Sequence, residues 1–285
     1  MDDGAQGVEF KAVYQLKGCV SKPKGSNVAV YRCEHSATKQ RRGVKLISAS
    51  HMDFDEPALV GEIQRLKRTA ELGMEGVAQF VALYRSDSPD EYQLVFTCAP
   101  LPPPIFAPRL ATGSTDEKAG AFTDPRRVEP LFDVITHKWM HVAHTFDSRP
   151  YEEEDAARIF RSIVTAVARL HSVNIVHGNL APDHILLDMD DDTKVYLPDL
   201  RWAGQITVES GVTQPLCFQR GTPGYASPEQ LHAQRSEAVR FDKEADVWSL
   251  GIILYMLLCG YPPFPGDGAE AIANVQSGKY SFPEK

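Results

Sequence analysis

The chain has 285 residues, enough for one large domain or two small ones, and its 43% hydrophobic and 24% charged content is ordinary for a globular protein. Its 30 basic and 38 acidic residues give a net charge of −8, which argues against nucleic acid or an anionic membrane surface as the main partner. Five scattered cysteines without a C-x-x-C pair predict neither a zinc site nor a disulfide framework.

The N-terminus and the longest apolar run bear on the cellular compartment. The chain starts Met-Asp-Asp-Gly, which is acidic and unlike the basic and then apolar start of a signal peptide. The apolar run at residues 247–259 is too short to span a bilayer. We therefore expect a cytoplasmic protein without a membrane partner.

The first hundred residues contain several segments with strand-like composition. Residues 27–33 and 43–48 are rich in β-branched side chains, and a polar turn at residues 34–42 separates them. Residues 77–84 and 92–97 have the same character and are predicted to form two more strands.

One helix is predicted among these strands, and a loop is predicted after them. Residues 57–72 have helical spacing. The predicted apolar face consists of Leu59, Ile63, Leu66 and Ala70. From residue 100 to about residue 127 the chain is rich in Pro, Gly, Ala and Thr and has no periodicity, which is typical of a long loop.

The second half is predicted to be mainly helical. Residues 151–172 begin with a run of acidic residues, which suits a helix N-terminus, and continue with apolar residues at helical spacing. Residues 194–197 are predicted to form a short strand, and residues 246–259 a very apolar helix buried at the centre of a domain. Strands first and helices later indicate a two-lobed α+β protein.

Residues 177–184 read His-Gly-Asn-Leu-Ala-Pro-Asp-His and resemble the catalytic loop of protein kinases, H-R-D-L-x-x-x-N. In that family the Asp accepts the proton of the substrate hydroxyl, and the Asn holds a metal ion on the phosphates. Here Asn179 stands at the base position and His184 at the metal position. Gly178 replaces the Arg, and Ala181 replaces the Lys that Ser/Thr kinases usually carry. The frame of the loop is kept while four working side chains are replaced.

Two further stretches carry the resemblance. Residues 221–229, Gly-Thr-Pro-Gly-Tyr-Ala-Ser-Pro-Glu, look like the end of a kinase activation segment, with Ser-Pro-Glu in place of A-P-E. Residues 246–251 and 260–264 resemble the central helix of the large lobe and the segment after it, in wording closest to calcium/calmodulin-dependent kinases. The resemblance implies a bilobal kinase-like fold, in which Asp246 would anchor the catalytic-loop backbone.

The resemblance also implies a nucleotide site. Lys45, in Val-Lys-Leu-Ile at the place of V-A-I-K, would pair the α- and β-phosphates, and Glu62 would steady it. A Lys on a strand and a Glu on an amphipathic helix are also common as solvated charges, and this alternative stays open. Asp199, at the D-F-G position, would be the metal-binding carboxylate, with Arg201 in place of the Gly.

The glycine loop that would cover the phosphates is incomplete. Residues 23–30 align with G-x-G-x-x-G-x-V, and of the three glycines only Gly25 is present. Because Pro23 also removes a backbone N–H group, we expect weakened phosphate binding. The cofactor-binding positions that the resemblance implies are Gly25, Val30, Lys45, Phe96, Cys98, Leu186 and Asp199.

The resemblance divides the chain into four parts. Residues 1–13 are predicted to be an N-terminal tail, residues 14–99 an N-lobe, residues 100–128 a Pro-rich insertion and residues 129–285 a C-lobe. A complete kinase C-lobe has further helices beyond the segment at which this chain stops, so an incomplete C-lobe is expected.

The replaced side chains favour a pseudokinase that acts as a scaffold or allosteric regulator for protein partners, such as signalling proteins or kinases. ATP, with or without Mg²⁺, is the expected ligand. A divergent Ser/Thr kinase that still phosphorylates protein hydroxyls is the main alternative, and a metal-independent nucleotide sensor and a ligand-free remnant are two more. Lys45 and Asp199 support an enzyme, whereas Asn179, Ala181 and His184 count against it.

Overall fold

The computed structural model describes residues 9–21, 28–52, 54–87, 90–97, 128–142, 149–188, 191, 193–209, 212–214, 222–233 and 242–282. The chain divides into two compact units. Unit 1 comprises Met1–Gly73, Ala78–Glu129 and Asp188–Asp190. Unit 2 comprises Met74–Val77, Pro130–Leu187 and Asp191–Lys285.

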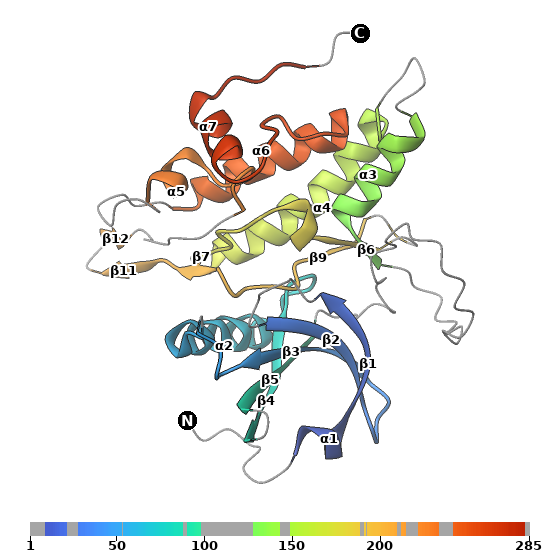
Figure 1. Cartoon of the computed structure of the whole chain (residues 1–285), viewed down its shortest axis with the longest axis vertical. Helices are drawn as coiled ribbons and strands as arrows, with labels where there is room; N and C mark the ends of the chain where they lie inside the picture. Colours follow the sequence, from blue (N-terminus) through green and yellow to red (C-terminus); the bar gives the residue numbers. More distant parts are fainter. Residues whose placement is uncertain are drawn as a thin grey trace. The chain divides into compact units, whose positions relative to one another are not determined.

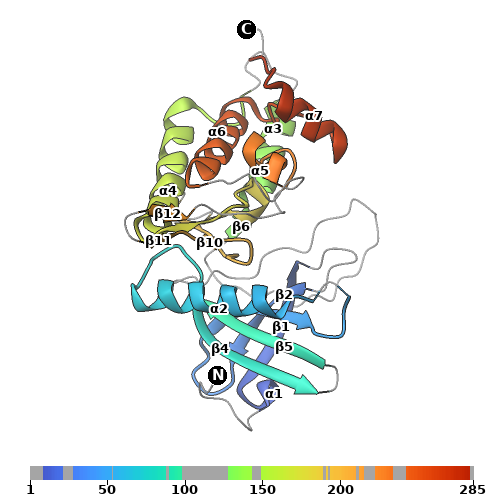
Figure 2. The same cartoon turned by 90° about the vertical axis from the view of Figure 1, so that its left-hand side faces the viewer.

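Unit 1 is built on a five-stranded antiparallel sheet with the strand order β1-β2-β3-β5-β4 (Figure 1). Its strands are β1 (Tyr14–Ser21), β2 (Val28–His35), β3 (Arg41–Ser48), β4 (Gln79–Asp87) and β5 (Asp90–Thr97). Helix α2 (Glu56–Glu71) lies against the sheet (Figure 2). Its N-terminus is capped by Asp55, whose side chain accepts a hydrogen bond from the backbone N–H of Ala58.

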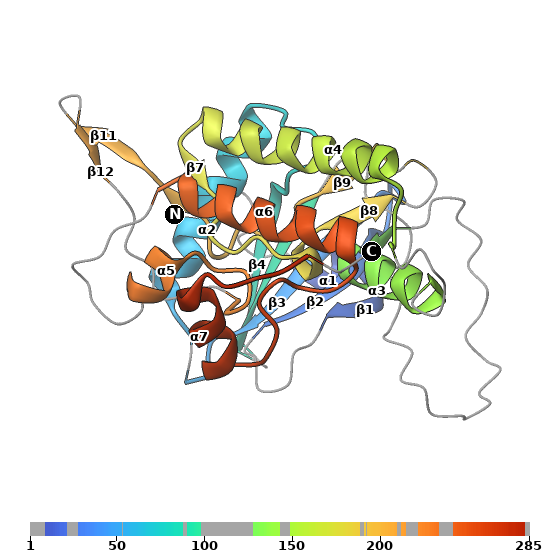
Figure 3. The same ribbon diagram turned by 90° about the horizontal axis from the view of Figure 1, so that it is seen from above.

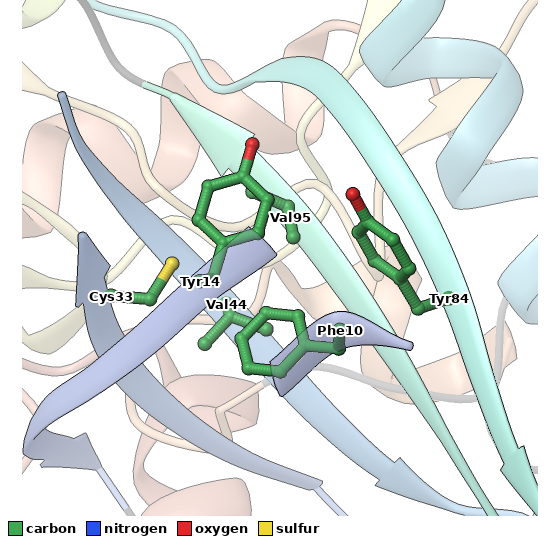
Figure 4. Packing of buried hydrophobic residues seen from close by; sticks show 6 residues of the cluster. All are labelled: Phe10, Tyr14, Cys33, Val44, Tyr84 and Val95. Atoms are coloured by element: carbon green, nitrogen blue, oxygen red, sulfur yellow. The ribbon is translucent and has the colours of Figure 1, made fainter. Parts of the chain in front are cut away.

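An apolar cluster covers the face of the sheet opposite Lys45. Val44 and Lys45 are neighbours on β3 and therefore point to opposite faces. Figure 4 shows the cluster around Val44, in which the rings of Phe10, Tyr14 and Tyr84 gather over the strands. Phe10 belongs to the short helix α1 (Phe10–Val13), inside the predicted tail, and it stacks on Tyr14 with ring centroids 5.5 Å apart. At least this part of the N-terminal segment is packed against the sheet.

Unit 2 is mainly helical (Figures 1 and 3). Its helices are α3 (Leu131–Val142), α4 (Glu153–Ser172), α5 (Pro228–Ala233), α6 (Glu244–Cys259) and α7 (Ala269–Ser277), with the 3-10 helix η1 (Pro182–His184). The short strands are β7 (Ile175–Val176), β9 (Val195–Tyr196), β10 (Gly204–Gln205), β11 (Thr207–Glu209) and β12 (Val212–Gln214). Two further strands, β6 (Val128–Pro130) and β8 (Leu186–Asp188), each include residues of both units.

The central helix of unit 2 is α6, which packs against α4 (Figure 3). Most of its residues are buried, as its nearly continuous apolar sequence predicts. It ends at Gly260, which has φ of 85° and donates its backbone N–H to the carbonyl oxygen of Met256. The predicted α+β class, with a strand-rich first half and a helical second half, is confirmed.

Several predicted strand boundaries were wrong because the pairing between strands decides where each strand begins and ends. The ladder between β2 and β3 includes the pairs Cys33↔Arg42 and Glu34↔Arg41, so the predicted turn at residues 34–42 is shorter. The predicted strand at residues 77–84 starts later, at Gln79. Val77 instead forms a parallel bridge with Leu197, and both residues belong to unit 2. The neighbouring Gly76 has φ of 79°, and a Cβ on residue 76 would lie 2.9 Å from the carbonyl oxygen of Val195.

The buried face of α2 also differs from the predicted one. Its buried residues are Leu59, Glu62, Leu66 and Thr69, whereas Ile63 and Ala70 are only partly buried. Two polar residues therefore occupy the inner stripe, and Thr69 satisfies its hydroxyl by donating to the carbonyl oxygens of Leu66 and Ala78. Among the helices in the described residues, none is both long and apolar enough to cross a membrane.

Candidate functional site

The predicted site residues of unit 1 form a buried ion pair. The ammonium group of Lys45 on β3 contacts the Oε1 atom of Glu62 on α2. The side chains are 3% and 1% exposed, which excludes the alternative that they are solvated surface charges. Lys45 lies opposite Val30 in the ladder between β2 and β3. Two of the residues predicted from the kinase resemblance, one on strand β3 and one on the buried face of α2, are thus in contact.

The ring of Phe96 on β5 stands beside this pair. Its centroid is 5.8 Å from the Lys45 Nζ atom, and the residue is 4% exposed. Phe96 is paired with Gly43 across the ladder between β3 and β5. A Cβ on residue 43 would lie 2.8 Å from the Phe96 Cε1 atom and closer still to Cζ, so the ring packs directly on the glycine backbone.

In unit 2, Asp246 near the start of α6 holds the backbone of the loop at residues 177–184. Its Oδ2 atom accepts the backbone N–H of His177 at 2.8 Å, and Oδ1 accepts that of Gly178 at 2.9 Å. The His171 Nε2 atom on α4 lies 2.7 Å from Oδ2. These contacts confirm the prediction that Asp246 anchors the loop, and they satisfy a carboxylate that is 1% exposed.

The two residues that Asp246 holds have unusual environments. Gly178 has φ of 71°, and a Cβ there would lie 3.0 Å from the carbonyl oxygen of Trp202, so glycine relieves backbone strain at this position. His177 is buried, and burial lowers its pKa to about 4, although the nearby Asp246 carboxylate acts in the opposite direction. Its imidazole is therefore neutral at physiological pH.

Asn179, at the base position, uses its side-chain oxygen to hold the activation-segment end. The Oδ1 atom accepts hydrogen bonds from both the backbone N–H of Thr222, at 2.9 Å, and its hydroxyl, at 3.0 Å. Asn179 is 9% exposed, and Ala181 beyond it is fully buried. A second tie runs from Gln230 on α5, whose Nε2 atom donates to the carbonyl oxygen of Gly178 at 2.8 Å. Thr222 could be located in a motif from the sequence, but its contact with Asn179 could not be predicted. No sequence pattern indicates the contact of Gln230 with Gly178.

His184, at the metal position, turns back onto the same loop. Its Nδ1 atom lies 2.8 Å from the carbonyl oxygen of Asn179, and its backbone N–H donates to Ala181 at 2.9 Å. Asp199 also lies in unit 2, where its Oδ1 atom accepts the backbone N–H of Arg201 at 3.0 Å. The Arg201 guanidinium stacks on the Trp202 ring, 4.4 Å from its centroid.

The other predicted positions are less informative. Leu186 lies on β8, belongs to unit 2 and is 8% exposed. Gly25 and Cys98 lie outside the described residues. Within the part of the chain that the structure describes, no cluster of three or more His, Cys, Asp or Glu side chains is arranged to hold a metal ion.

The fold, the buried Lys–Glu pair and the Asp246-anchored loop are those of a protein kinase domain, and comparison with known proteins gives the same assignment. The family described as "Protein kinase domain" matches residues 118–282. The chain is 31% identical over 280 residues to myosin light chain kinase A of Dictyostelium discoideum, covering 97% of this chain and 77% of that protein. The chain belongs to the protein kinase family.

Two other relatives are similar over a shorter region. Calcium/calmodulin-dependent protein kinase type 1 of Caenorhabditis elegans is 38% identical over 134 residues, covering 46% of this chain and 36% of that protein. MAP kinase-activated protein kinase 2 of Homo sapiens is 36% identical over 139 residues, covering 47% of this chain and 32% of that protein. Less than half the length of each of these two relatives is therefore matched. As a family, protein kinase domains use ATP with Mg²⁺.

Proposed function

We propose that this protein is a catalytically impaired member of the protein kinase family that acts as a scaffold or allosteric regulator for protein partners. The observation that carries the proposal is the state of Asn179. Its side-chain oxygen accepts two hydrogen bonds from Thr222, and an amide has no basic lone pair to take up a proton. The loss of a positioned general base typically lowers a rate by ~10²–10⁴-fold.

The neighbouring positions add to this defect. Ala181 supplies no positive charge for the transferred phosphoryl group, and electrostatic stabilisation is the main part of this chemistry. His184 offers imidazole nitrogen where Mg²⁺ requires oxygen. His184 therefore does not fit the ion that the family uses, whereas the carboxylate of Asp199 is a suitable ligand for it. Because such effects are not additive within one catalytic unit, the combined loss is not the product of the individual losses.

Nucleotide binding remains part of the proposal. The buried contact between Lys45 and Glu62 is the feature that positions a lysine for phosphate in active kinases. The same contact favours the second candidate, a divergent Ser/Thr kinase that phosphorylates protein hydroxyls slowly. We place the protein in the cytoplasm, with signalling proteins or kinases as its partners.

A restoration experiment separates the two candidates. Asn179→Asp, Ala181→Lys and His184→Asn would be combined in one variant, and transfer of labelled γ-phosphate to a Ser/Thr-containing protein substrate would be compared with the wild type. We expect the wild type to transfer phosphate no faster than a no-enzyme blank. The triple variant should exceed the rate of that blank at least about 10²-fold. Wild-type transfer that the triple variant does not increase would favour the divergent kinase.

A further inference from the structure

The side chain of Gln230 on α5 joins two segments that are far apart in the sequence. Gln230 is 1% exposed. Its Nε2 atom donates to the carbonyl oxygen of Gly178 at 2.8 Å, and its Oε1 atom accepts the backbone N–H of Ser227 at 3.0 Å. Exchanging the two amide atoms would place a donor against a donor and an oxygen against an oxygen. These two partners therefore fix the orientation of the buried amide.

Gln230 ends a segment, residues 222–230, that is held at two further points. At its start, the backbone N–H and the hydroxyl of Thr222 both donate to the Asn179 Oδ1 atom. In its middle, the carbonyl oxygen of Tyr225 accepts the hydroxyl of Ser249 on α6 at 2.8 Å. The segment is thus attached to the catalytic loop at both ends and to the central helix between them.

These attachments close a ring of contacts within unit 2. Asp246 lies three residues before Ser249 on α6 and holds the backbone N–H groups of residues 177 and 178. Residues 178 and 179 hold the two ends of the segment at residues 222–230, and its middle returns to α6. Every bond in the ring is made by side chains and backbone groups of the chain itself, so the ring closes without an added phosphate.

Gly178 supplies only backbone groups to this ring. It stands where the family carries an Arg, and kinases that are activated by phosphorylation order their activation segment through pairs between Arg and the phosphorylated residue. A larger residue is disfavoured at position 178, because φ is 71° and a Cβ would lie 3.0 Å from the carbonyl oxygen of Trp202. The carbonyl oxygen of Gly178 is instead the acceptor for Gln230.

We infer that Gln230 is a positioning residue that, together with Asn179, holds residues 222–230 on the catalytic loop without phosphorylation. The buried hydrogen bonds of the ring replace the pair of Arg and phosphate that other kinases use. The inference itself does not depend on whether phosphotransfer is lost. Its consequence for a scaffold, that protein partners meet a segment already formed, rests on the proposed function.

The first test is hydrogen exchange on wild-type protein whose unphosphorylated state is verified by its intact mass. Exchange of the backbone amides at residues 222–227 would be followed at neutral pH. We expect the amide of Thr222, which donates to Asn179, to exchange at least about fivefold more slowly than in an unstructured chain. Exchange of this segment at the rate of an unstructured chain would overturn the inference.

The second test removes the amide of Gln230. Gln230→Met keeps a side chain of similar length but has no strong donor or acceptor. It should accelerate exchange at residues 222–227 at least about fivefold, because two buried hydrogen bonds are lost. Exchange in α4 should stay as in the wild type. An acceleration of the same size in α4 would indicate a general loss of stability and would overturn the positioning role.

A milder variant covers the case in which Gln230→Met does not fold. Thr222→Val removes only the hydroxyl bond to Asn179 and keeps the backbone N–H bond. It should accelerate exchange of the amide at residue 222 by about twofold or more, again with α4 unchanged. An unchanged exchange rate at residue 222 would contradict the inferred attachment.

The matched control is Gln205→Met on β10. The side-chain amide of Gln205 also donates to backbone carbonyl oxygens of unit 2, those of residues 173, 174 and 206. In this variant the exchange at residues 222–227 should equal that of the wild type, and an acceleration as large as in Gln230→Met would overturn the inference. None of these measurements depends on phosphotransfer, so a failure here leaves the proposed catalytic impairment to its own test.

Discussion

At the scale of single residues, the buried Lys45–Glu62 pair has the largest energetic consequence. Both side chains are almost fully excluded from water, so the contact between their two charges is buried. Removing one partner of a buried ion pair typically costs about 3–5 kcal/mol, whereas replacing both with apolar residues of similar volume is often close to neutral. The pair therefore matters for stability whether or not the protein binds ATP.

This reasoning predicts different results for single and double substitutions. Lys45→Met alone should lower the free energy of unfolding by about 3–5 kcal/mol, because Glu62 loses the buried ammonium group that it contacts. The double variant Lys45→Met/Glu62→Leu should recover most of that loss. Denaturant titration of the wild type and the two variants would measure these free energies of unfolding. An equal loss of stability in both variants would show that the two side chains are not coupled.

His177 gives a pH-dependent prediction. Burial lowers its pKa to about 4, whereas in the unfolded chain it titrates near its ordinary value of 6.5. Between these values the unfolded state binds a proton that the folded state does not, so the free energy of unfolding falls as pH decreases. The loss should reach about 3 kcal/mol by pH 4, at 1.36 kcal/mol per tenfold difference in proton affinity.

The control for this prediction is His177→Phe, which fills the same volume without a titrating group. Among the described residues the His177 Nε2 atom has no hydrogen-bond partner, so the phenyl ring leaves no polar atom unsatisfied on that side. Urea titrations from pH 7 to pH 4 should show that the extra pH dependence disappears in the variant. An unchanged pH dependence would mean that other groups cause it.

The chemistry of the catalytic loop could be predicted from the sequence, whereas its contacts could not. Asn179, Ala181 and His184 lie in one contiguous frame, so their replacement is visible by position. The partners Thr222 and Gln230 come from segments more than forty residues further along the chain. No local pattern marks such pairs, and only the folded structure shows that the side-chain oxygen of Asn179 is already occupied.

At the scale of elements, strands β3 and β5 fit together because a glycine on β3 lies opposite an aromatic ring on β5. Gly43 leaves the space that the Phe96 ring fills, and the ring in turn stands beside the Lys45 ammonium group. Local composition predicted both strands, but the need for glycine at position 43 depends on which residue lies opposite. The same limit explains the α2 error, because the amphipathic spacing does not reveal that Glu62 has a buried partner.

Gly43→Ala should be destabilising even though alanine is the better residue for a strand interior. The added methyl group would overlap the Phe96 ring, and overpacking of this kind typically costs about 1–3 kcal/mol. Phe96→Leu in the Gly43→Ala background should recover part of the loss by making room. Melting curves of the two single variants and the double variant form a cycle, and strict additivity would contradict the proposed contact.

At the scale of the whole molecule, the two units differ in how much their sequences reveal. The family match covers residues 118–282, which belong mostly to unit 2, where motifs such as residues 221–229 are contiguous. In unit 1 the predicted glycine loop retains one of three glycines, and the pairing of β3 with β5 joins strands that are not consecutive in the chain. The segment Met74–Val77 belongs to unit 2 although residues of unit 1 flank it on both sides. The assignment of this segment to unit 2 depends on tertiary contacts, which the periodicity of the sequence does not predict.

The central claim, that a kinase fold persists here without efficient phosphotransfer, is tested most directly by a single-turnover assay. Stoichiometric protein would be mixed with Mg²⁺, γ-labelled ATP and a Ser/Thr-containing substrate, and label in the substrate and in the protein would be followed over time. The reference is Lys45→Met/Glu62→Leu, which should keep the fold while lacking the phosphate-pairing lysine. We predict that the wild type and this variant incorporate label at the same background rate. Faster incorporation by the wild type that disappears in the variant would contradict the account and identify a working kinase.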